Sequence, residues 1–184
     1  MDNQIKIGFD LDGVIIDKPP LISKGLLEWL VRSHQNKKLA YRYPPLPERL
    51  VRWLSHHPLL RPAIKENLEF IKKIAKNKKY KLYLISGRYS FLAGRTQQWL
   101  KKYQIYNLFE GVFINLKNEQ PYLFKTKKIK ELKINLYIDD DQPLSEYLIK
   151  SARQVKVYCF DQRRERKAKS QIHFINSLKE IFKK

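Results

Sequence analysis

The chain has 184 residues, 43% of them hydrophobic, which suits one domain with a sizeable core and argues against a disordered chain. Its 38 Lys and Arg against 18 Asp and Glu give a net charge of +20, which would attract polyanions such as nucleic acid or phosphorylated substrates. No apolar run approaches the roughly 20 residues of a membrane span, and Asp2, Asp10 and Asp12 stand where a signal peptide is apolar, so we predict a cytoplasmic protein without membrane contact.

Five short segments rich in branched and aromatic residues are predicted strands. In chain order they are residues 5–9, 81–85, 111–114, 136–138 and 155–160. Cys159, in the last of them, is the only cysteine of the chain, which excludes an internal disulfide and a cysteine-based zinc cluster. Its apolar neighbours predict a buried thiol.

Helical patterns separate most of these segments. The first begins at Pro62 and passes through Ile71, the second has Ser90 as its cap and passes through Trp99, and the third begins at Pro143 and passes through Leu148. Strands that alternate with helices predict an α/β fold in which helices cover both faces of a doubly wound parallel sheet.

Residues 18–61 interrupt this alternation between the first strand and the helix at Pro62. Pro-rich stretches bracket them, and they contain nine basic residues against two acidic ones. We predict that residues 18–61 form a small helical cap inserted into a catalytic core of residues 1–17 and 62–184. Such a lid selects substrates by stacking on bases and by attracting polyanions.

Polar residues follow three of the predicted strands. They are Asp10 and Asp12 after the first strand, Ser86, Gly87 and Arg88 after the second, and Asp139, Asp140 and Asp141 after the fourth. In an open parallel sheet the ligand site lies beyond the carboxyl ends of the strands. Carboxylates gathered there repel one another unless a cation lies among them, and hard oxygen ligands favour Mg²⁺.

These residues resemble the four motifs of the haloacid-dehalogenase-like (HAD) phosphohydrolase superfamily. The motifs are DLDG at 10–13, ISGR at 85–88, a lysine at 125 and IDDD at 138–141, in the order and spacing of the family. The sequence around these motifs is similar to that of the 5'(3')-deoxyribonucleotidase group with a small helical cap. The resemblance covers nearly the whole chain and implies a Rossmann-like core that hydrolyses phosphomonoesters with Mg²⁺.

The resemblance also implies a role for each motif residue. Asp10, in the position of the family nucleophile, would attack phosphorus and form an aspartyl-phosphate. Asp12 would protonate the leaving oxygen and later deprotonate the attacking water, because its side chain points to the same side of an extended segment. Ser86 and the backbone N–H groups of Gly87 and Arg88 would bind phosphoryl oxygens, with help from the positive end of the next helix.

Lys125 would neutralise charge on the transferring group and pair with Asp10. Lys127 and Lys128 lie on the same segment and stay open as alternatives, since any of the three can be a solvated lysine at the start of a helix. We favour Lys125 because the family places its lysine four residues before an apolar helix position, here Ile129.

The implied magnesium ligands are four aspartates. They are the side chains of Asp10, Asp139 and Asp140 and the backbone carbonyl of Asp12. Of the pair Asp139 and Asp140, one would bind the metal directly and the other through water or Lys125. Asp141 is predicted to cap the next helix.

The insert carries cations and aromatic residues that suit substrate selection. Its predicted cations for substrate capture are Arg42, Arg49 and Arg52. Its aromatic residues, Trp29, Tyr41, Tyr43 and Trp53, are either base platforms or lid core, and the helical spacing around Trp29 favours lid core. His56 and His57 lack a metal-binding pattern and are interpreted as loop residues.

The sequence thus predicts a Mg²⁺-dependent phosphomonoester hydrolase whose substrate is most plausibly a nucleotide. A phosphatase of nucleic-acid ends, or of another small phosphorylated metabolite, is the alternative enzyme. In a different class, a scaffold without turnover would bind nucleic acid through its basic surface. The retained motif residues argue against the scaffold, and the second acid, Asp12, argues against dehalogenation.

Overall fold

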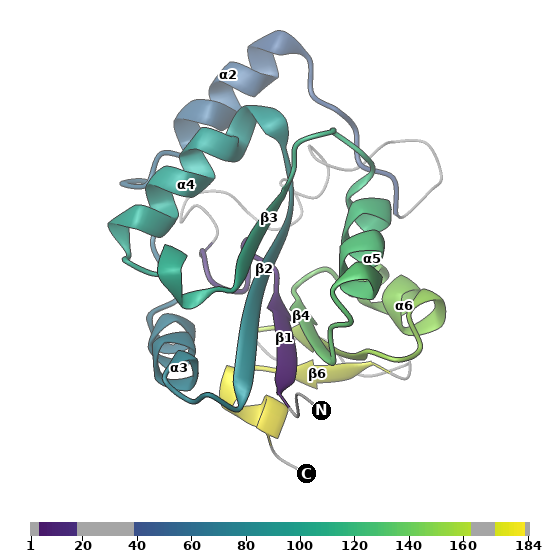
Figure 1. Ribbon diagram of the computed structural model, residues 1–184. Coiled ribbons are helices and arrows are strands. Elements are labelled where there is room, and N and C mark those ends of the chain that lie inside the picture. Colours follow the sequence, from purple (N-terminus) through teal and green to yellow (C-terminus); the bar gives the residue numbers. More distant parts are fainter. Residues whose placement is uncertain (1–3, 18–38, 163–171, 183–184) are drawn as a thin grey trace.

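The computed structural model describes residues 4–17, 39–162 and 172–182. Their strands form one sheet in the order β3-β2-β1-β4-β5-β6, and every neighbouring pair is parallel (Figure 1). The strands are β1 (Ile5–Phe9), β2 (Tyr80–Tyr89), β3 (Gly111–Asn115), β4 (Leu136–Asp139), β5 (Lys156–Phe160) and β6 (His173–Ile175).

Helices cover both faces of this sheet, which confirms the predicted doubly wound α/β fold (Figure 1). The α-helices are α2 (Leu46–Ser55), α3 (Lys65–Ala75), α4 (Ala93–Lys102), α5 (Pro121–Glu131) and α6 (Gln142–Ser151). Three short 3₁₀-helices are η1 (Ser90–Leu92), η2 (Tyr106–Leu108) and η3 (Leu178–Phe182). The helices α3 and α4 lie on one face, and α5 and α6 lie on the other (Figure 1).

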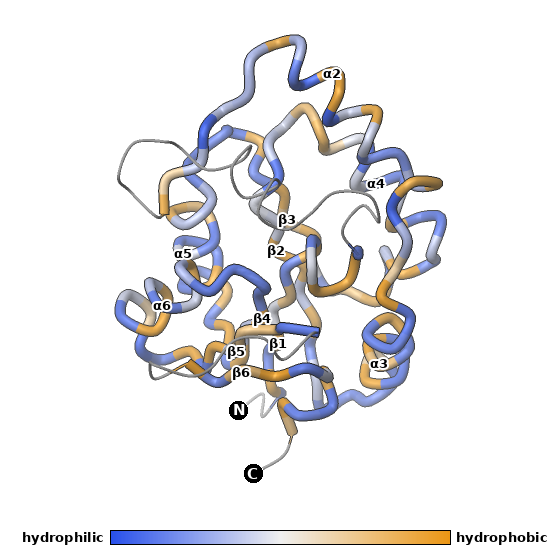
Figure 2. The backbone as a smooth tube through the Cα atoms, turned by 180° about the vertical axis from the view of Figure 1, so that it is seen from behind, coloured by the Kyte–Doolittle hydropathy of each residue, from blue (hydrophilic) through white to orange (hydrophobic). Residues whose placement is uncertain are grey.

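Two apolar clusters hold the helices to the sheet. Ile71 of α3 and Trp99 of α4 pack with Phe9 of β1 under one face, and Phe124 and Leu148 belong to a second cluster under the other face. Figure 2 shows polar and apolar residues alternating along α3 and α6, as expected for helices with one face on a sheet. Cys159 is buried in β5, as predicted.

The elements between β1 and α4 differ from their predicted bounds. Strand β2 continues to Tyr89 because Ser86 and Tyr89 still pair with β3. Ser90 therefore does not cap a helix: it is the first residue of η1, and α4 begins only at Ala93. Helix α3 begins at Lys65 and not at Pro62, because Ala63 bridges to the loop after β1 and Ile64 is extended.

Two further differences concern the second half of the chain. The three-residue strand β6 was not predicted, because so short a segment carries no periodic signal. Lys125, considered above as a residue at the start of a helix, lies inside α5, since this helix already begins at Pro121.

The described part of the insert contains one α-helix, α2, and Trp29 and His34 lie outside the described residues. Helix α2 lies against α4 (Figure 1): the Arg95 guanidinium stacks 3.5 Å from the centre of the Trp53 ring, and its Nε donates to the Trp53 carbonyl. No residue of α2 is buried. Its leucines and valine, Leu46, Leu50, Val51 and Leu54, are 58–69% exposed. The role of the insert as a cap stays a prediction.

No helix within the described ranges is both long enough and apolar enough to cross a membrane.

Candidate active site

The predicted motif residues come together where β1, β2 and β4 end. Strand β1 lies between β2 and β4, so the carboxyl ends of these three strands are neighbours. Asp10 directly follows β1, and its backbone N–H donates to the carbonyl of Ile138 in β4 over 2.9 Å. Asp139 is the last residue of β4. The sheet thereby places two carboxylates, more than a hundred residues apart in sequence, side by side.

A lysine lies between these two carboxylates. The Nζ of Lys125 is 2.9 Å from Asp10 Oδ1 and 2.7 Å from Asp139 Oδ2, and all three side chains are buried. Lys127 is exposed, and Lys128 pairs with Glu131 on the outer surface of α5. Among the three alternatives, the structure therefore brings Lys125 into the site.

The pKa values of this cluster depend on burial and on mutual charge. Burial raises the pKa of Asp10 well above its ordinary value, Lys125 opposes this effect, and Asp139 adds to it. Burial alone would lower the pKa of Lys125, but the carboxylates of Asp10 and Asp139 outweigh it and raise that pKa. Lys125 is consequently an ammonium group, and the carboxylates beside it need a further cation to stay charged together.

Asp140 completes a group of three carboxylates that fits such a cation. Asp10, Asp139 and Asp140 each offer an oxygen, and these oxygens lie within 4.8 Å of one another. Gly13 makes room for Asp140: a Cβ on Gly13, whose φ is +75°, would lie 2.2 Å from Asp140 Oδ2. Three clustered carboxylate oxygens suit Mg²⁺, with water and phosphate as its remaining ligands.

Asp141 supports this group from the start of α6. Its side chain accepts a hydrogen bond from the backbone N–H of Leu144, which confirms the predicted helix cap. Its own N–H donates to Asp139 Oδ1 over 3.0 Å. The Asp139 carboxylate is thus held on one oxygen by Asp141 and on the other by Lys125.

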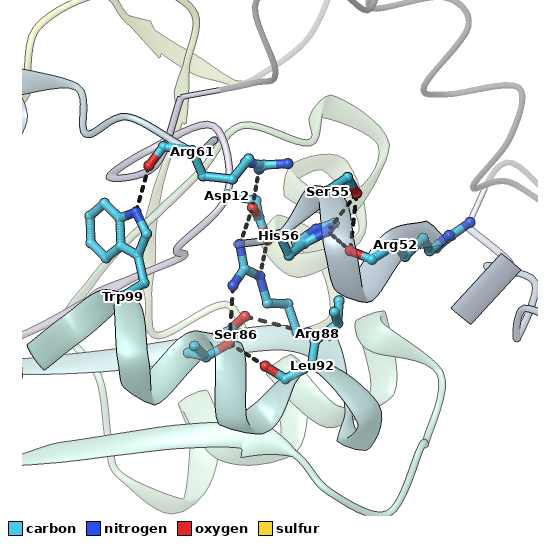
Figure 3. A network of polar contacts seen from close by, with 10 residues as sticks. Asp12, Arg52, Ser55, His56, Arg61, Ser86, Arg88, Leu92 and Trp99 are labelled. Atoms are coloured by element: carbon cyan, nitrogen blue, oxygen red, sulfur yellow. Dashed lines mark hydrogen bonds and ion pairs between the residues drawn. The ribbon is translucent and has the colours of Figure 1, made fainter. Parts of the chain in front are cut away.

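The Asp12 side chain lies outside the metal group and binds two arginines (Figure 3). Arg88 donates from Nε to Asp12 Oδ2 over 2.6 Å and from Nη2 to Oδ1 over 2.7 Å, and Arg61 Nη2 donates to Oδ1 over 2.6 Å. Burial alone would raise the pKa of Asp12, but Arg88 and Arg61 hold it far below its ordinary value. Asp12 is therefore a carboxylate, and only its backbone carbonyl stays a predicted metal ligand.

Ser86, Gly87 and Arg88 differ in part from their predicted surroundings. No helix begins at these residues, because they belong to β2, so the expected helix dipole is absent at this point. The Arg88 N–H lies 3.4 Å from Ser86 Oγ, and the Arg88 side chain turns to Asp12. A Cβ on Gly87 would lie 2.9 Å from Pro121 Cβ, so glycine here lets α5, which carries Lys125, approach the strand.

The three predicted capture arginines lie on α2 and the segment before it, where each has local contacts. Arg42 and Arg52 both pair with Glu48. Arg49 Nε donates to the Pro44 carbonyl over 2.8 Å, and its guanidinium lies 4.5 Å from the centre of the Tyr43 ring. A role in substrate binding stays a prediction for all three.

The segment that leads into α2 reaches the mouth of the site. The Tyr41 hydroxyl bonds to the Asp141 carboxylate, and its backbone N–H donates to Gln120 Oε1 over 3.0 Å. Tyr43 packs edge-on against Tyr89, with ring centres 4.9 Å apart. Tyr41 thereby links the insert to the first residues of α5 and α6.

Two residues of the site, Arg61 and His56, were not predicted: Arg61 belongs to no motif, and His56 was expected to be a loop residue. His56 is the C-cap of α2, and its Nδ1 lies 2.6 Å from the Arg52 carbonyl (Figure 3). Burial, together with Arg88 and Arg61, lowers the pKa of His56 to about 3, so its imidazole is neutral at physiological pH. A single arginine or histidine has no spacing signature, and Arg61 meets Asp12 only across 49 residues of sequence.

No family model and no curated protein sequence matches the chain. Solved structures do match it. A HAD phosphatase from Thermococcus onnurineus is 13% identical with a TM-score of 0.59, and the match covers 97% of this chain and 96% of that chain. A HAD-family enzyme from Bacteroides thetaiotaomicron, in complex with magnesium and inorganic phosphate, is 13% identical with a TM-score of 0.52, covering 86% and 94% of the two chains.

A third similar structure is L-2-haloacid dehalogenase from Xanthobacter autotrophicus, with 10% identity, a TM-score of 0.53, and coverage of 97% of this chain and 96% of that chain. The chain therefore has the fold of HAD hydrolases. Because phosphatases and a dehalogenase share this fold, the reaction has to be inferred from the residues of the site.

Proposed function

We propose that this protein is a Mg²⁺-dependent phosphomonoester hydrolase that works through an aspartyl-phosphate. The observation that carries the proposal is the buried group of Asp10, Lys125 and Asp139, with Asp140 close enough for all three carboxylates to share a cation. A nucleophilic carboxylate beside a cation site and an ammonium group suits attack on a phosphate dianion, whose charge would otherwise repel it.

Two displacements make up the reaction. First, a carboxylate oxygen of Asp10 attacks phosphorus, the bond between phosphorus and the leaving oxygen breaks, and Asp12 donates a proton to that oxygen. Second, water attacks the aspartyl-phosphate, Asp12 takes its proton, and Asp10 leaves with its bonding electrons. Lys125 neutralises phosphoryl charge throughout. Bound Mg²⁺ would supply further neutralisation and orient the phosphate.

Asp12 favours phosphate hydrolysis over dehalogenation. A halide leaves without a proton, whereas an alkoxide needs one, so a group that donates a proton to the leaving atom is required in phosphomonoester cleavage and is not required in carbon–halogen cleavage. The phosphate dianion also opposes the charges of Arg61 and Arg88, and thereby raises the pKa of Asp12 towards a value at which it can carry a proton.

A phosphatase screen with and without Mg²⁺ tests the proposal. The panel contains nucleotides, sugar phosphates, and oligonucleotides with 3′- or 5′-phosphates, and the Asp10→Asn variant is the control. We expect Mg²⁺-dependent release of phosphate by wild type and none by Asp10→Asn, while Asp12→Asn slows turnover by about 10²–10⁴. An Asp10→Asn protein with wild-type activity would contradict the mechanism.

The proposed substrate is a nucleotide, and the net charge of +20 supports nucleic-acid ends as the alternative. Changing Arg42, Arg49 and Arg52 together to Gln separates these two. A rise in KM for mononucleotides and oligonucleotides alike supports the nucleotidase, whereas a rise confined to oligonucleotides supports the alternative. An unchanged KM for both would show that these arginines do not bind substrate.

A further inference from the structure

The two oxygens of the Asp12 carboxylate accept different numbers of hydrogen bonds. Oδ1 accepts one N–H from Arg61 and one from Arg88, whereas Oδ2 accepts one from Arg88 (Figure 3). A carboxylate oxygen has two lone pairs for such bonds. Oδ1 is therefore fully engaged, and Oδ2 keeps one lone pair that no described residue occupies.

Arg88 is fixed by the core of the protein. It lies on β2 with its side chain 4% exposed, and its Nη1 donates to Thr96 Oγ1 over 3.0 Å. That hydroxyl in turn lies 3.0 Å from the Leu92 carbonyl, so it joins Arg88 to η1 and α4 (Figure 3). Arg88 binds Asp12 in the parallel two-bond geometry that sets the plane of a carboxylate.

Arg61 approaches Asp12 from the other side, at the end of the insert. The buried Trp99 donates from Nε1 to the Arg61 carbonyl over 2.7 Å, which fixes the backbone at this point. The Arg61 side chain is 5% exposed, and its Nε has no hydrogen-bond partner among the described residues. Among the carboxylates that act on the Arg61 guanidinium, Asp12 has the largest effect, and Asp17 and Asp140 contribute less. The ion pair with Asp12, 2.6 Å long, is therefore the main polar contact of this side chain.

We propose that Arg61 is a positioning residue: by occupying the second lone pair of Asp12 Oδ1, it assigns proton transfer to Oδ2. This inference rests on the proposed phosphohydrolase reaction. Without Arg61, Oδ1 would keep a free lone pair, and the proton would no longer be confined to Oδ2. Arg61 acts through Asp12, and so it matters most when the leaving group needs a proton.

The test compares leaving groups. We measure kcat/KM of wild type and of Arg61→Ala with 4-nitrophenyl phosphate, whose leaving group departs without a proton, and with a nucleoside 5′-monophosphate, whose alkoxide requires one. We expect the loss on the nucleotide to exceed the loss on the aryl ester by about tenfold or more, within the range for general acid catalysis. Free guanidinium ion should restore part of the nucleotide activity.

Arg153→Ala is the matched control, because Arg153 is an exposed arginine in the turn after α6. It should change neither rate. If Arg61→Ala fails to fold, Arg61→Lys is used instead. Lysine keeps the positive charge but lacks the planar set of donors of a guanidinium group. The loss of kcat/KM on the nucleotide should again exceed the loss on the aryl ester, by a smaller factor.

Each outcome of this comparison either supports or contradicts the proposed role of Arg61. An equal loss on both substrates would show that Arg61 binds the phosphate or only supports the fold, and would overturn the inference while the proposed function stands. A wild-type protein that hydrolyses no phosphomonoester of the whole panel would overturn both, and if another alkyl phosphate of the panel is the better substrate, it takes the place of the nucleotide in this comparison. A greater loss on the nucleotide supports Arg61 as the residue that positions Asp12.

Discussion

Two ionic clusters meet at the end of the sheet, and their charges are opposite. In the first, the carboxylates of Asp10, Asp139 and Asp140 lie together, and one ammonium group, that of Lys125, pairs with Asp10 and Asp139. In the second, two guanidinium groups surround one carboxylate, that of Asp12. Carboxylates outnumber the ammonium group in the first cluster, and guanidinium groups outnumber the carboxylate in the second.

This difference in charge indicates what each cluster can bind. A group of carboxylates with an excess of negative charge is stabilised by a cation, and a group of guanidiniums with an excess of positive charge is stabilised by an anion. A magnesium ion and a phosphate dianion meet both needs at neighbouring positions. The same comparison predicts which changes each cluster tolerates.

Lys125→Met should produce the largest effect on folding. The change leaves Asp10 and Asp139 buried without their ammonium partner, and breaking a buried ion pair in this way costs about 3–5 kcal/mol. Urea unfolding in EDTA measures the loss, and added Mg²⁺ should recover part of it. Lys127→Met, on the exposed side of α5, is the matched control and should stay within about 0.5 kcal/mol of wild type. Equal losses of unfolding free energy in the two variants would show that Lys125 is not the lysine that pairs with the buried carboxylates.

Magnesium binding should stabilise the fold through the first cluster alone. At a concentration one hundred times its Kd, Mg²⁺ adds about 2.7 kcal/mol by mass action. The double variant Asp139→Asn, Asp140→Asn should lose this response, whereas Glu131→Gln, which removes an exposed carboxylate of α5, should keep it. Thermal melting across millimolar Mg²⁺ measures the effect. A wild-type Tm that does not move would count against the cation site.

His56 should make the second cluster sensitive to acid. Its pKa is about 6.5 in the unfolded chain and about 3 in the folded protein, so the unfolded state binds more protons between these pH values. Above pH 6.5, His56 is neutral in both states and does not affect the free energy of unfolding. As the pH falls below 6.5, the unfolded chain takes up a proton that the folded protein does not, so the free energy of unfolding decreases. From pH 7 to pH 5, wild type should lose up to about 2 kcal/mol more than His56→Asn.

Urea unfolding in EDTA at the two pH values measures this difference, and His57→Asn controls for removal of a neighbouring imidazole. The physical reasons for the low pKa of His56 are that burial disfavours the charged imidazolium and that a proton on His56 would add a third positive charge beside Arg88 and Arg61. An identical pH dependence in wild type and His56→Asn would contradict the placement of this side chain.

Among the changes to the two clusters, Gly13→Ala should have the smallest effect on stability, together with a specific effect on metal binding. A left-handed φ of +75° costs an alanine about 1–2 kcal/mol, and its Cβ would displace Asp140 from the cation site. We expect a weaker Mg²⁺ response in melting curves. Gly94→Ala in α4 meets nothing within 4 Å and should stabilise the protein by about 0.5–1 kcal/mol. A normal Mg²⁺ response in Gly13→Ala would exclude Asp140 as a ligand.

Much of the α/β fold was predictable because its signals are local. Strand segments, Pro-led helices and the cap at Asp141 each depend on a few adjacent residues, and all were found near their predicted places. The errors fall where tertiary contacts override local preference. Strand β2 extends past Ser86 because β3 continues to pair with it, and α3 begins late because Ala63 bridges to the loop after β1.

Local sequence signals specify the order of the elements and the residue types at the strand ends, because periodicity and motif spacing are properties of neighbours along the chain. The partners of those residues follow from the tertiary structure. It selected Lys125 from three nearby lysines by the rotation of α5, and it brought Arg61 to Asp12 by pinning its carbonyl to Trp99. Contacts between distant residues depend on how helices and strands pack, and no local pattern encodes that packing.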